Sequence, residues 1–434
     1  MAQQDMLAAA HAAVKSALGK GAQEAAARTY RVREVEVKWR DGSLEKVHEA
    51  TTRGLGLTLY VDGRYANVST SDLRPEALDT FIADSVTLTR ALAKDPFRTL
   101  PDPKLYEGQA KVDLLLEDPK YATVTPEQRR AVAKEIEAAA RAVKGASSIL
   151  SVTTGFSDTL SESWRVASNG FSGSRRDTSF WISAEVSVGD SDGRKPEDYS
   201  FAGARFVGEL PKAAQVGREA AERALSRLGA KKGESAVLTM AVENRSAGRL
   251  PAYLLGPLSG GALQQKRSFL EGKLGQAIAS PLVTLVDDPL VPKGFGSRLF
   301  DGEGIAAKRM PVVEAGVLKT YFIDTYYGKK LQMAPTTGGP SNLVWTLGDK
   351  DQAALLAAMK EGILVTGFLG GNSNGLTGDF SLGVQGFRVR GGKIAEPVGE
   401  MNISGNHLEL WKKLVAVGND PYPYSSMKTP TLVF

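Results

Sequence analysis

The most consequential absence from this 434-residue chain is cysteine, which does not occur at all. Disulfide bonds, thiolate metal ligands and cysteine nucleophiles are therefore excluded. Histidine is nearly as scarce, because His11, His48 and His407 are the only three and lie far apart in the sequence. A catalytic zinc site usually needs two histidines and a third ligand. We therefore expect no metal site in this chain, unless all three histidines converge or carboxylates replace them.

Long apolar runs are also missing. No window approaches eighteen uninterrupted apolar residues, so no membrane-spanning helix is expected. The first twenty residues have no basic segment followed by an apolar block, and they predict an amphipathic helix rather than a signal peptide. A cytoplasmic location is the default expectation. A Walker motif is absent as well, which removes one common class of nucleotide-binding enzyme.

No strong excess of one charge is present. Lysine and arginine number 54 against 49 aspartates and glutamates, for a formal net charge of +5, and the two signs are interspersed. A nucleic-acid surface would need a clustered basic face with aromatic residues, so no nucleic-acid partner is expected. With 42% hydrophobic and 24% charged residues, the composition is that of an ordinary globular protein. The length suggests two or three domains.

The first half of the chain mixes strand and helix patterns. Alternating apolar residues at 35–39 and 55–61 predict strands that turn at Asp41-Gly42 and Asp62-Gly63. Residues 125–128 (TPEQ) form a capping box that should open a helix. The remaining expected elements are an amphipathic helix from Pro75, a connector over 95–119, strands over 147–207 and a helix over 211–228.

The polar segment 229–235 is the expected domain boundary. We predict an N-terminal mixed α/β domain at 1–229 and a strand-rich C-terminal domain with an antiparallel sheet at 230–434. In the second half, Glu314-Ala315-Gly316 and Gly391-Gly392 indicate hairpin turns, and helices are expected from Asp349 and His407. Blocks of strands and helices without βαβ regularity predict the α+β fold class.

Two acidic clusters could in principle hold a hard cation. They are Asp287-Asp288-Pro289 and Asp301-Gly302-Glu303-Gly304. Neither has the spacing of an EF-hand loop or of a carboxylate pair on one helix. Tight turns, which favour Asp and Gly, are the first interpretation of both.

A glycine- and amide-rich segment near the end of the chain is the most informative feature. Residues 367–381 read GFLGGNSNGLTGDFS, and residues 400–406 read EMNISGN. Such a backbone bends sharply and offers N–H and C=O groups to a neighbour. An extended peptide added to a strand edge could use polar contacts at Asn372, Asn374, Thr377, Asp379 and Asn402. The alternative is that these residues only form turns and bulges of a twisted sheet.

The order of several short motifs resembles the TldD/TldE (PmbA) peptidase family, and its TldE half more closely. The motifs are 54–57 (GLGL), 62–64 (DGR), 167–173 (ASNGFSG), 268–275 (SFLEGKLG), 279–289 (ASPLVTLVDDP), 300–304 (FDGEG), 314–321 (EAGVLKTY), the glycine-amide segment and 429–432 (TPTL). The resemblance implies a two-domain α+β peptidase subunit, in a family also called modulator of DNA gyrase. It also implies that a TldE-type chain pairs with a TldD-type chain around a cavity that admits extended or unfolded peptides.

The chain departs from the TldD pattern where that pattern binds zinc. TldD-type chains carry a His-Glu-x-x-x-His helix and a late cysteine. Here Pro251 and Gly256 stand where the histidines are expected, Ala252 stands where the glutamate is expected, and 418–420 (GND) occupies the cysteine region. Without ligands there is no metal-bound water of lowered pKa. The resemblance therefore implies no catalytic residue and no cofactor in this chain, with zinc in a TldD-type partner.

Three hypotheses follow for the function. The first is a TldE-type subunit that shapes the chamber and holds substrate while its partner cuts. The second is a peptidase with an unusual metal site built from Asp287, Asp288, Asp301 or Glu303. The third is a homodimer that binds peptides without chemistry.

Overall fold

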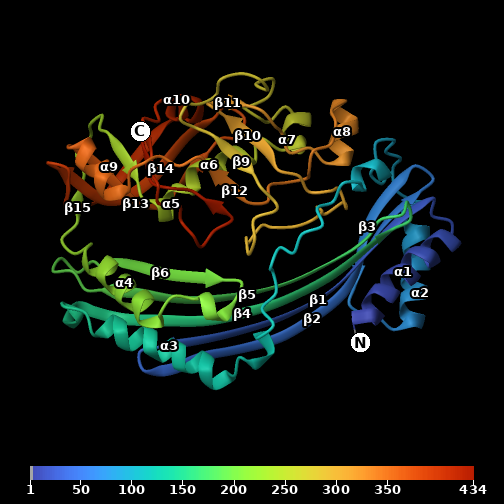
Figure 1. Cartoon of the computed structure of the whole chain (residues 1–434), viewed down its shortest axis with the longest axis horizontal. Helices are drawn as coiled ribbons and strands as arrows, with labels where there is room; N and C mark the ends of the chain where they lie inside the picture. Colours follow the sequence, from blue (N-terminus) through green and yellow to red (C-terminus); the bar gives the residue numbers. More distant parts are fainter. Residues whose placement is uncertain (1–2) are drawn as a thin grey trace.

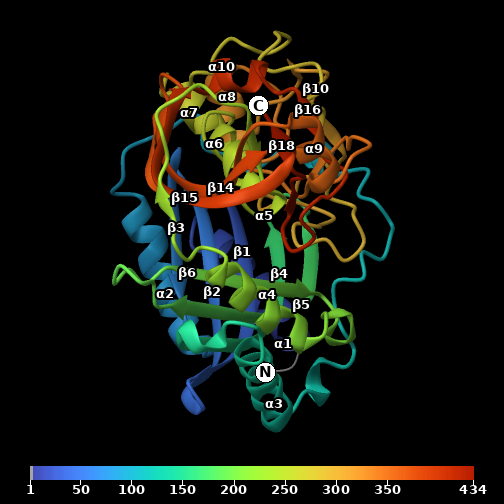
Figure 2. The same cartoon turned by 90° about the vertical axis from the view of Figure 1, so that its left-hand side faces the viewer.

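The computed structural model describes residues 3–434, and its N-terminal half is one long antiparallel sheet covered by helices (Figures 1 and 2). The strands are β1 (Glu24–Arg40), β2 (Ser43–Val61), β3 (Arg64–Thr70), β4 (Ile149–Ala167), β5 (Ser172–Val188) and β6 (Glu197–Ala204). They lie in the order β3-β2-β1-β4-β5-β6. The predicted hairpin turn at Asp41-Gly42 is confirmed, since both residues have positive φ angles, of 47° and 83°.

Four helices pack on this sheet in two pairs (Figure 1). They are α1 (Gln3–Gly19), α2 (Pro75–Thr89), α3 (Pro126–Arg141) and α4 (Ala213–Leu225). α1 and α2 bury the apolar residues at one end of the sheet, including Leu55, Leu57 and Leu59. α3 and α4 cover the other end, over Ile182 and Ala202. The predicted capping box is confirmed at α3, where the side chains of Thr125 and Gln128 each bind the other's backbone N–H.

The C-terminal half contains two smaller sheets. The five-stranded sheet has the order β11-β10-β9-β12-β17, and the seven-stranded sheet has the order β16-β18-β8-β13-β14-β15-β7. Their strands are β7 (Lys231–Lys232), β8 (Met240–Val242), β9 (Leu285–Asp287), β10 (Met310–Glu314), β11 (Val317–Leu318), β12 (Leu343–Trp345), β13 (Gly362–Ser373), β14 (Asp379–Arg390), β15 (Lys393–Asn406), β16 (Ala416–Val417), β17 (Met427–Lys428) and β18 (Leu432–Val433). The α+β class is confirmed. The expected antiparallel C-terminal sheet is mixed, because β8, β7 and β17 each pair in parallel with a neighbour.

Six helices accompany these sheets: α5 (Asn244–Ala247), α6 (Arg249–Leu255), α7 (Gly260–Gln264), α8 (Thr325–Leu331), α9 (Gln352–Met359) and α10 (His407–Lys412). The two helices expected from the sequence are α9 and α10, and Asp351 rather than Asp349 caps α9. Sequence patterns did not predict α8. It has seven residues, too few for a clear apolar period, and its N-terminus is capped by the Asp324 side chain.

The two halves face each other across the uncovered face of the long sheet (Figure 1). The predicted connector at 95–119 lies between them and hydrogen-bonds to the C-terminal half, where Lys293 N donates to Leu114 O at 2.7 Å. The Arg205 side chain crosses in the other direction and donates to Phe295 O at 2.8 Å. The placement of the domain boundary at 229/230 stays a prediction.

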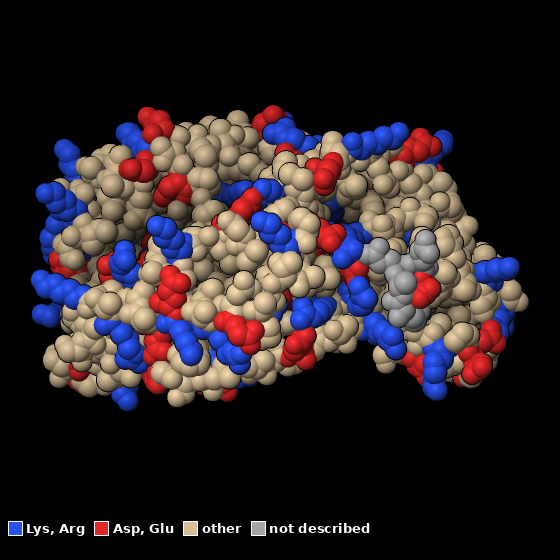
Figure 3. Space-filling view, turned by 60° about the horizontal axis from the view of Figure 1, so that its bottom comes forward, with Lys and Arg blue, Asp and Glu red and all other residues tan. Residues whose placement is uncertain are grey.

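Charges of both signs are intermixed on the face that Figure 3 shows, as the sequence predicts. Among residues 3–434, no helix has both the length and the apolar character needed to traverse a bilayer.

Candidate functional site

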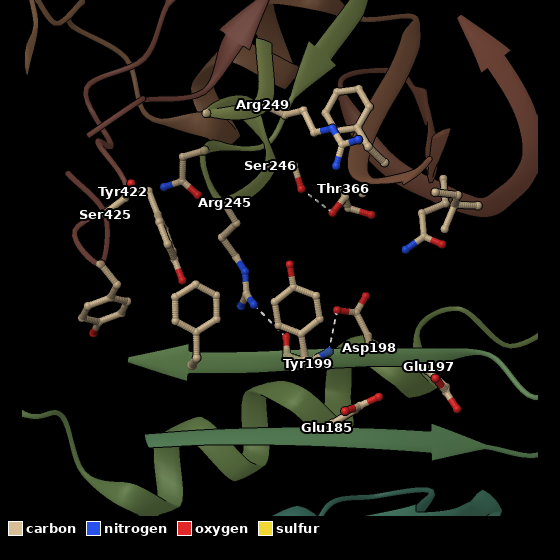
Figure 4. Close-up of a pocket in the computed structure, with 18 of the residues that line it drawn as sticks. Glu185, Glu197, Asp198, Tyr199, Arg245, Ser246, Arg249, Thr366, Tyr422 and Ser425 are labelled. Carbon is tan, nitrogen blue, oxygen red and sulfur yellow. Dashed lines mark hydrogen bonds between the residues drawn. The ribbon is translucent and has the colours of Figure 1, made fainter. Parts of the chain in front are cut away.

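One pocket lies between the two halves and has a volume of about 720 Å³ (Figure 4). Its floor is the uncovered face of β5 and β6, and its roof consists of α5, α6 and the middle of β13. A loop before the C-terminus adds Tyr422, Tyr424 and Ser425. This volume is in the range of pockets that bind small organic molecules or a few residues of a peptide.

The floor is aromatic and acidic. In the β5–β6 register, Glu185 lies opposite Tyr199 and Ser183 lies opposite Phe201. Side chains alternate between the two faces of a strand, so Glu197, Tyr199 and Phe201 point the same way. The rings of Tyr199 and Phe201 stack with their centroids 6.0 Å apart. Half of the Tyr199 surface is exposed, which leaves this ring accessible from the pocket.

The roof is held above the floor by hydrogen bonds that Figure 4 shows. Ser246 Oγ donates to the Thr366 carbonyl oxygen at 2.7 Å and joins α5 to β13. Arg245 extends downward, and its Nη2 donates to the Tyr199 carbonyl oxygen at 2.7 Å. Arg245 also forms an ion pair with Glu219 of α4. The walls of the pocket are therefore fixed by contacts between the two halves.

A second charged contact joins α4 to the N-cap of α5 and to β6. Arg223 donates to Glu243 at 2.7 Å and to Asp198 at 3.2 Å. Burial lowers the pKa of Arg223, but the hydrogen bond and charge of Glu243 outweigh it, so the pKa lies above the ordinary value. Tyr422, on the loop before the C-terminus, is buried against Phe201, and burial raises the pKa of its hydroxyl. Within residues 3–434, that hydroxyl has no hydrogen-bond partner.

Helix α6 is where the resemblance places the zinc motif, and it borders this pocket through Arg249 and Ala252. The observed side chains do not fit a metal ion. Pro251, Ala252 and Gly256 offer no nitrogen, oxygen or sulfur ligand. In the part of the chain that the structure describes, no group of three or more His, Cys, Asp or Glu side chains could hold a metal.

The segment at the expected cysteine position lies next to α5. Asn244 Nδ2 donates to the Asp420 carbonyl oxygen at 2.7 Å. The Asp420 carboxylate accepts hydrogen bonds from the backbone and side chain of Thr431, at 3.0 and 2.7 Å. The Asp420 carboxylate is thus engaged by hydrogen bonds from Thr431, just before β18.

The five predicted peptide contacts belong to β13–β15 and do not line the pocket described above. Asn372 lies near the end of β13, Asn374 and Thr377 form the turn to β14, Asp379 begins β14, and Asn402 lies on β15. All five are exposed. Asn374 Oδ1 accepts from Leu376 N at 2.9 Å. Thr377 donates to Asp379 at 2.7 Å.

Asp379 also accepts a hydrogen bond from Asn406, which lowers the pKa of its carboxyl group. The three turn residues therefore stabilise the hairpin. Their contact with peptide stays a prediction.

The three histidines do not converge. His11 is exposed on α1 and His48 is exposed on β2, whereas His407 is fully buried at the start of α10. The alternative carboxylates are engaged in hydrogen bonds with other parts of the C-terminal half. Asp287 accepts from Ser341 N and Oγ at 2.6 and 2.7 Å, and Glu303 accepts from Thr325 N at 2.8 Å. Burial raises the pKa of both acids.

Asp301 accepts from Ile305 N at 3.0 Å, and Asp288 accepts from Leu290 N at 3.0 Å. These hydrogen bonds agree with the turn interpretation of both acidic clusters.

Sequence reasoning did not single out Tyr199, Arg245 or Arg249. The local pattern of 197–201 (EDYSF) did carry a signal, since it alternates polar and aromatic residues on one strand. Which face of that strand meets α5 and α6 is decided by contacts more than forty residues away in the sequence.

Comparisons with known proteins cover nearly the whole chain. Residues 25–89 match domain 1, residues 119–228 the central domain and residues 235–434 the C-terminal domain of the PmbA/TldA metallopeptidases. The Metalloprotease PmbA of Escherichia coli O157:H7 is 30% identical over 399 residues, covering 89% of this chain and 85% of that protein. A Metalloprotease PmbA homolog of Haemophilus influenzae is 29% identical over 436 residues, covering 99% and 95%.

Two solved structures have the same fold. A candidate modulator of DNA gyrase from Bacteroides thetaiotaomicron is 41% identical with a TM-score of 0.97, covering 100% of this chain and 98% of that one. TldE from Thermococcus kodakarensis is 19% identical with a TM-score of 0.86, covering 98% of each chain.

Proposed function

Because this chain belongs to the PmbA/TldA metallopeptidase family, we propose that it is a TldE-type subunit of a peptidase that acts on extended or unfolded peptides. In this proposal a TldD-type partner supplies the zinc ion and the cutting chemistry, in the cytoplasm. This chain supplies walls of the peptide-binding chamber. The observation that carries the proposal is that Pro251, Ala252 and Gly256, where the resemblance places the metal helix, offer no metal ligand, on and just after a helix that borders the pocket.

Two features of the structure support peptide binding. The pocket offers exposed aromatic surface and backbone carbonyl groups, which contact peptides without reading their sequence. The outer edge of β15 is the second feature. β7 pairs with β15 only at Val398 and Gly399, so in the described chain no strand covers the outer side of 400–406. An extended peptide could add there as a strand, with Asn402 beside it.

The test is reconstitution with a TldD-type chain from the same genome that carries His-Glu-x-x-x-His. Each purified chain and their mixture are assayed for zinc by elemental analysis and for cleavage of an unfolded protein. We expect no stoichiometric zinc and no cleavage with this chain alone, and cleavage in the mixture. The matched control is a partner whose motif glutamate is replaced by glutamine, which should assemble but not cut.

Each other outcome would assign a different function. Cleavage by the metal-free chain alone would contradict the proposal. Peptide binding that never leads to cleavage, even with an active partner, would favour the peptide-binding homodimer. Stoichiometric metal that is lost on replacing Asp287 or Asp301 would favour the carboxylate-metal peptidase.

A further inference from the structure

Two acids lie on the floor of the pocket between the two halves and Arg249 lies in its roof, while Lys195 borders the floor from the loop before β6. Glu185 and Glu197 project from the floor, from β5 and β6, and both are exposed. Neither carboxylate has an ion-pair partner within residues 3–434. Figure 4 shows both acids on the strands beneath the pocket, while Arg249 comes from the helix above it.

Arg249 differs from the other arginines that line the pocket. Arg245 is paired with Glu219, and Arg227 donates to Gln385 Oε1 and to a backbone carbonyl. Arg249 donates through Nε to the Tyr253 hydroxyl at 2.9 Å, one helical turn further along α6. Among the described residues it has no carboxylate partner, so its two terminal nitrogens are available to a ligand.

Tyr253 holds the Arg249 side chain in place. Its ring lies 5.3 Å from the buried ring of His407, measured between centroids, and this contact fixes it against the domain core. The guanidinium of Arg249 lies 5.7 Å from the Tyr253 ring centroid. An arginine fixed by one nitrogen and open at the other two matches the two oxygens of a carboxylate.

Resting on the peptide-binding function proposed above, we propose that Arg249 anchors the C-terminal carboxylate of a bound peptide. A carboxylate in this pocket is attracted to the roof by Arg249 and repelled from the floor by Glu185 and Glu197. The charges thus select one orientation of the peptide. Arg249 stands two residues before Pro251, where the resemblance begins the zinc motif. In this proposal, α6 of this chain holds the C-terminal end of a peptide. The corresponding helix of a TldD-type chain lies where that chain would cleave a peptide.

A second hollow gives the rest of the peptide a path. It has a volume of about 300 Å³ and shares Glu185, Tyr199 and Phe201 with the pocket between the two halves. It continues along the uncovered face of the sheet, over Thr153, Gly155, Ser157 and Ser183. Gly155 and the small side chains leave room for a main chain, and the three hydroxyl groups can hydrogen-bond to it.

The experiment compares three fluorescein-labelled short peptides of Gly, Ser, Ala and Leu by fluorescence anisotropy on the full-length chain. The first has a free C-terminal carboxylate, the second a C-terminal amide, and the third an amide plus one internal glutamate. We expect the free acid to bind roughly tenfold more tightly than the amide, as a bidentate charged hydrogen bond implies. The third peptide distinguishes a terminal from a side-chain carboxylate as the ligand.

Four variants test which side chain causes the preference for the free-acid peptide over the amide. R249Q should bind the acid and the amide equally, and R249K should keep part of the preference because it keeps the charge but loses the bidentate geometry. K195Q removes Lys195, which also lines the pocket and has no carboxylate partner among residues 3–434, and should keep the preference. R267Q is the matched control, since Arg267 is exposed in the same half and does not line the pocket. Urea unfolding of each variant verifies that it is folded.

Equal binding of acid and amide by the wild-type chain would overturn the anchor while leaving peptide binding in place. A preference that survives in R249Q, or that disappears in K195Q, would overturn it too. Tighter binding of the internal-glutamate peptide than of the free acid would assign Arg249 to side chains rather than to the peptide end. No binding of any peptide would contradict the proposed function itself, and the anchor with it.

Discussion

Ser373 and His407 are 34 residues apart in the sequence, yet Ser373 Oγ lies 2.8 Å from His407 Nε2. The contact joins the end of β13 to the start of α10. The imidazole is fully buried, and aromatic rings surround it: Tyr253 at 5.3 Å, Phe269 at 5.8 Å and Phe380 at 4.8 Å between centroids. In the described structure, Nδ1 has no hydrogen-bond partner. His407 is therefore a core residue that links the glycine-amide hairpin to α6.

This burial predicts that acid destabilises the protein. Burial lowers the pKa of His407 to about 4, whereas the unfolded chain has the ordinary value near 6.5. Between these values the unfolded state binds the proton and the folded state does not. Stability is therefore complete above pH 6.5 and falls as the pH drops toward 4, by at most about 3 kcal/mol. Urea unfolding at a series of pH values from 8 to 5 measures this loss.

The other two histidines provide the control for this experiment. His11 and His48 are exposed, so H11N and H48N should show the wild-type pH dependence. H407N should be less stable at pH 8, because it loses ring contacts, and its stability should change less with pH. An unfolding free energy of the wild type that is constant from pH 8 to pH 5 would show that His407 accepts a proton in the folded state.

The pair Arg129–Asp158 predicts a large cost for removing one charge. Arg129 Nε lies 2.5 Å from Asp158 Oδ2, and the two side chains are 2% and 0% exposed. D158A leaves a buried guanidinium without its partner and should lower the free energy of unfolding by about 3–5 kcal/mol. The double variant R129M/D158L should recover much of this loss, as measured by urea unfolding. A loss below about 1 kcal/mol in D158A would mean that water reaches the arginine.

The close approach of α3 and α4 at Gly217 predicts that any side chain there would force the two helices apart. A Cβ atom built there would lie 2.0 Å from the Ile136 carbonyl oxygen, so α3 and α4 approach too closely for any side chain. G217A should destabilise the protein by about 1–3 kcal/mol or more, through forced separation of the helices. G208A is the control, because a Cβ at Gly208 would meet nothing within 4 Å. Similar melting temperatures for the two variants would contradict this packing.

Replacing the exposed Tyr199 side chain should weaken peptide binding with little effect on the free energy of unfolding. Its side chain is 51% exposed on the pocket floor, so Y199A removes little buried surface and should change the unfolding free energy by less than about 1 kcal/mol. Removing an aromatic platform of this kind should weaken peptide binding roughly tenfold. Phe97 is an exposed aromatic residue away from the pocket, and F97A should bind normally in the same anisotropy assay. Unchanged affinity in Y199A would exclude the floor from the binding site.

Local sequence patterns predicted the long elements well. The alternation through Val35 and Leu57, the turns at Asp41 and Asp62 and the capping box at Thr125 all operate within a few residues, and the structure has each of them. The short helices α5–α8 were harder, because four to seven residues give no clear periodicity. The parallel pairing of β8 with β13 joins residues more than 120 positions apart, which no local pattern encodes.

The sequence by itself determined the chemistry that this chain lacks. It has no cysteine, and no potential ligand stands at Pro251, Ala252 or Gly256, because a side chain's ligand atoms are a property of its residue type. Only the tertiary structure decided that Arg249 and Tyr199 face one pocket and that His407 is buried. The positions of these side chains depend on which faces of distant strands and helices meet. The packing of the two halves determines which faces those are.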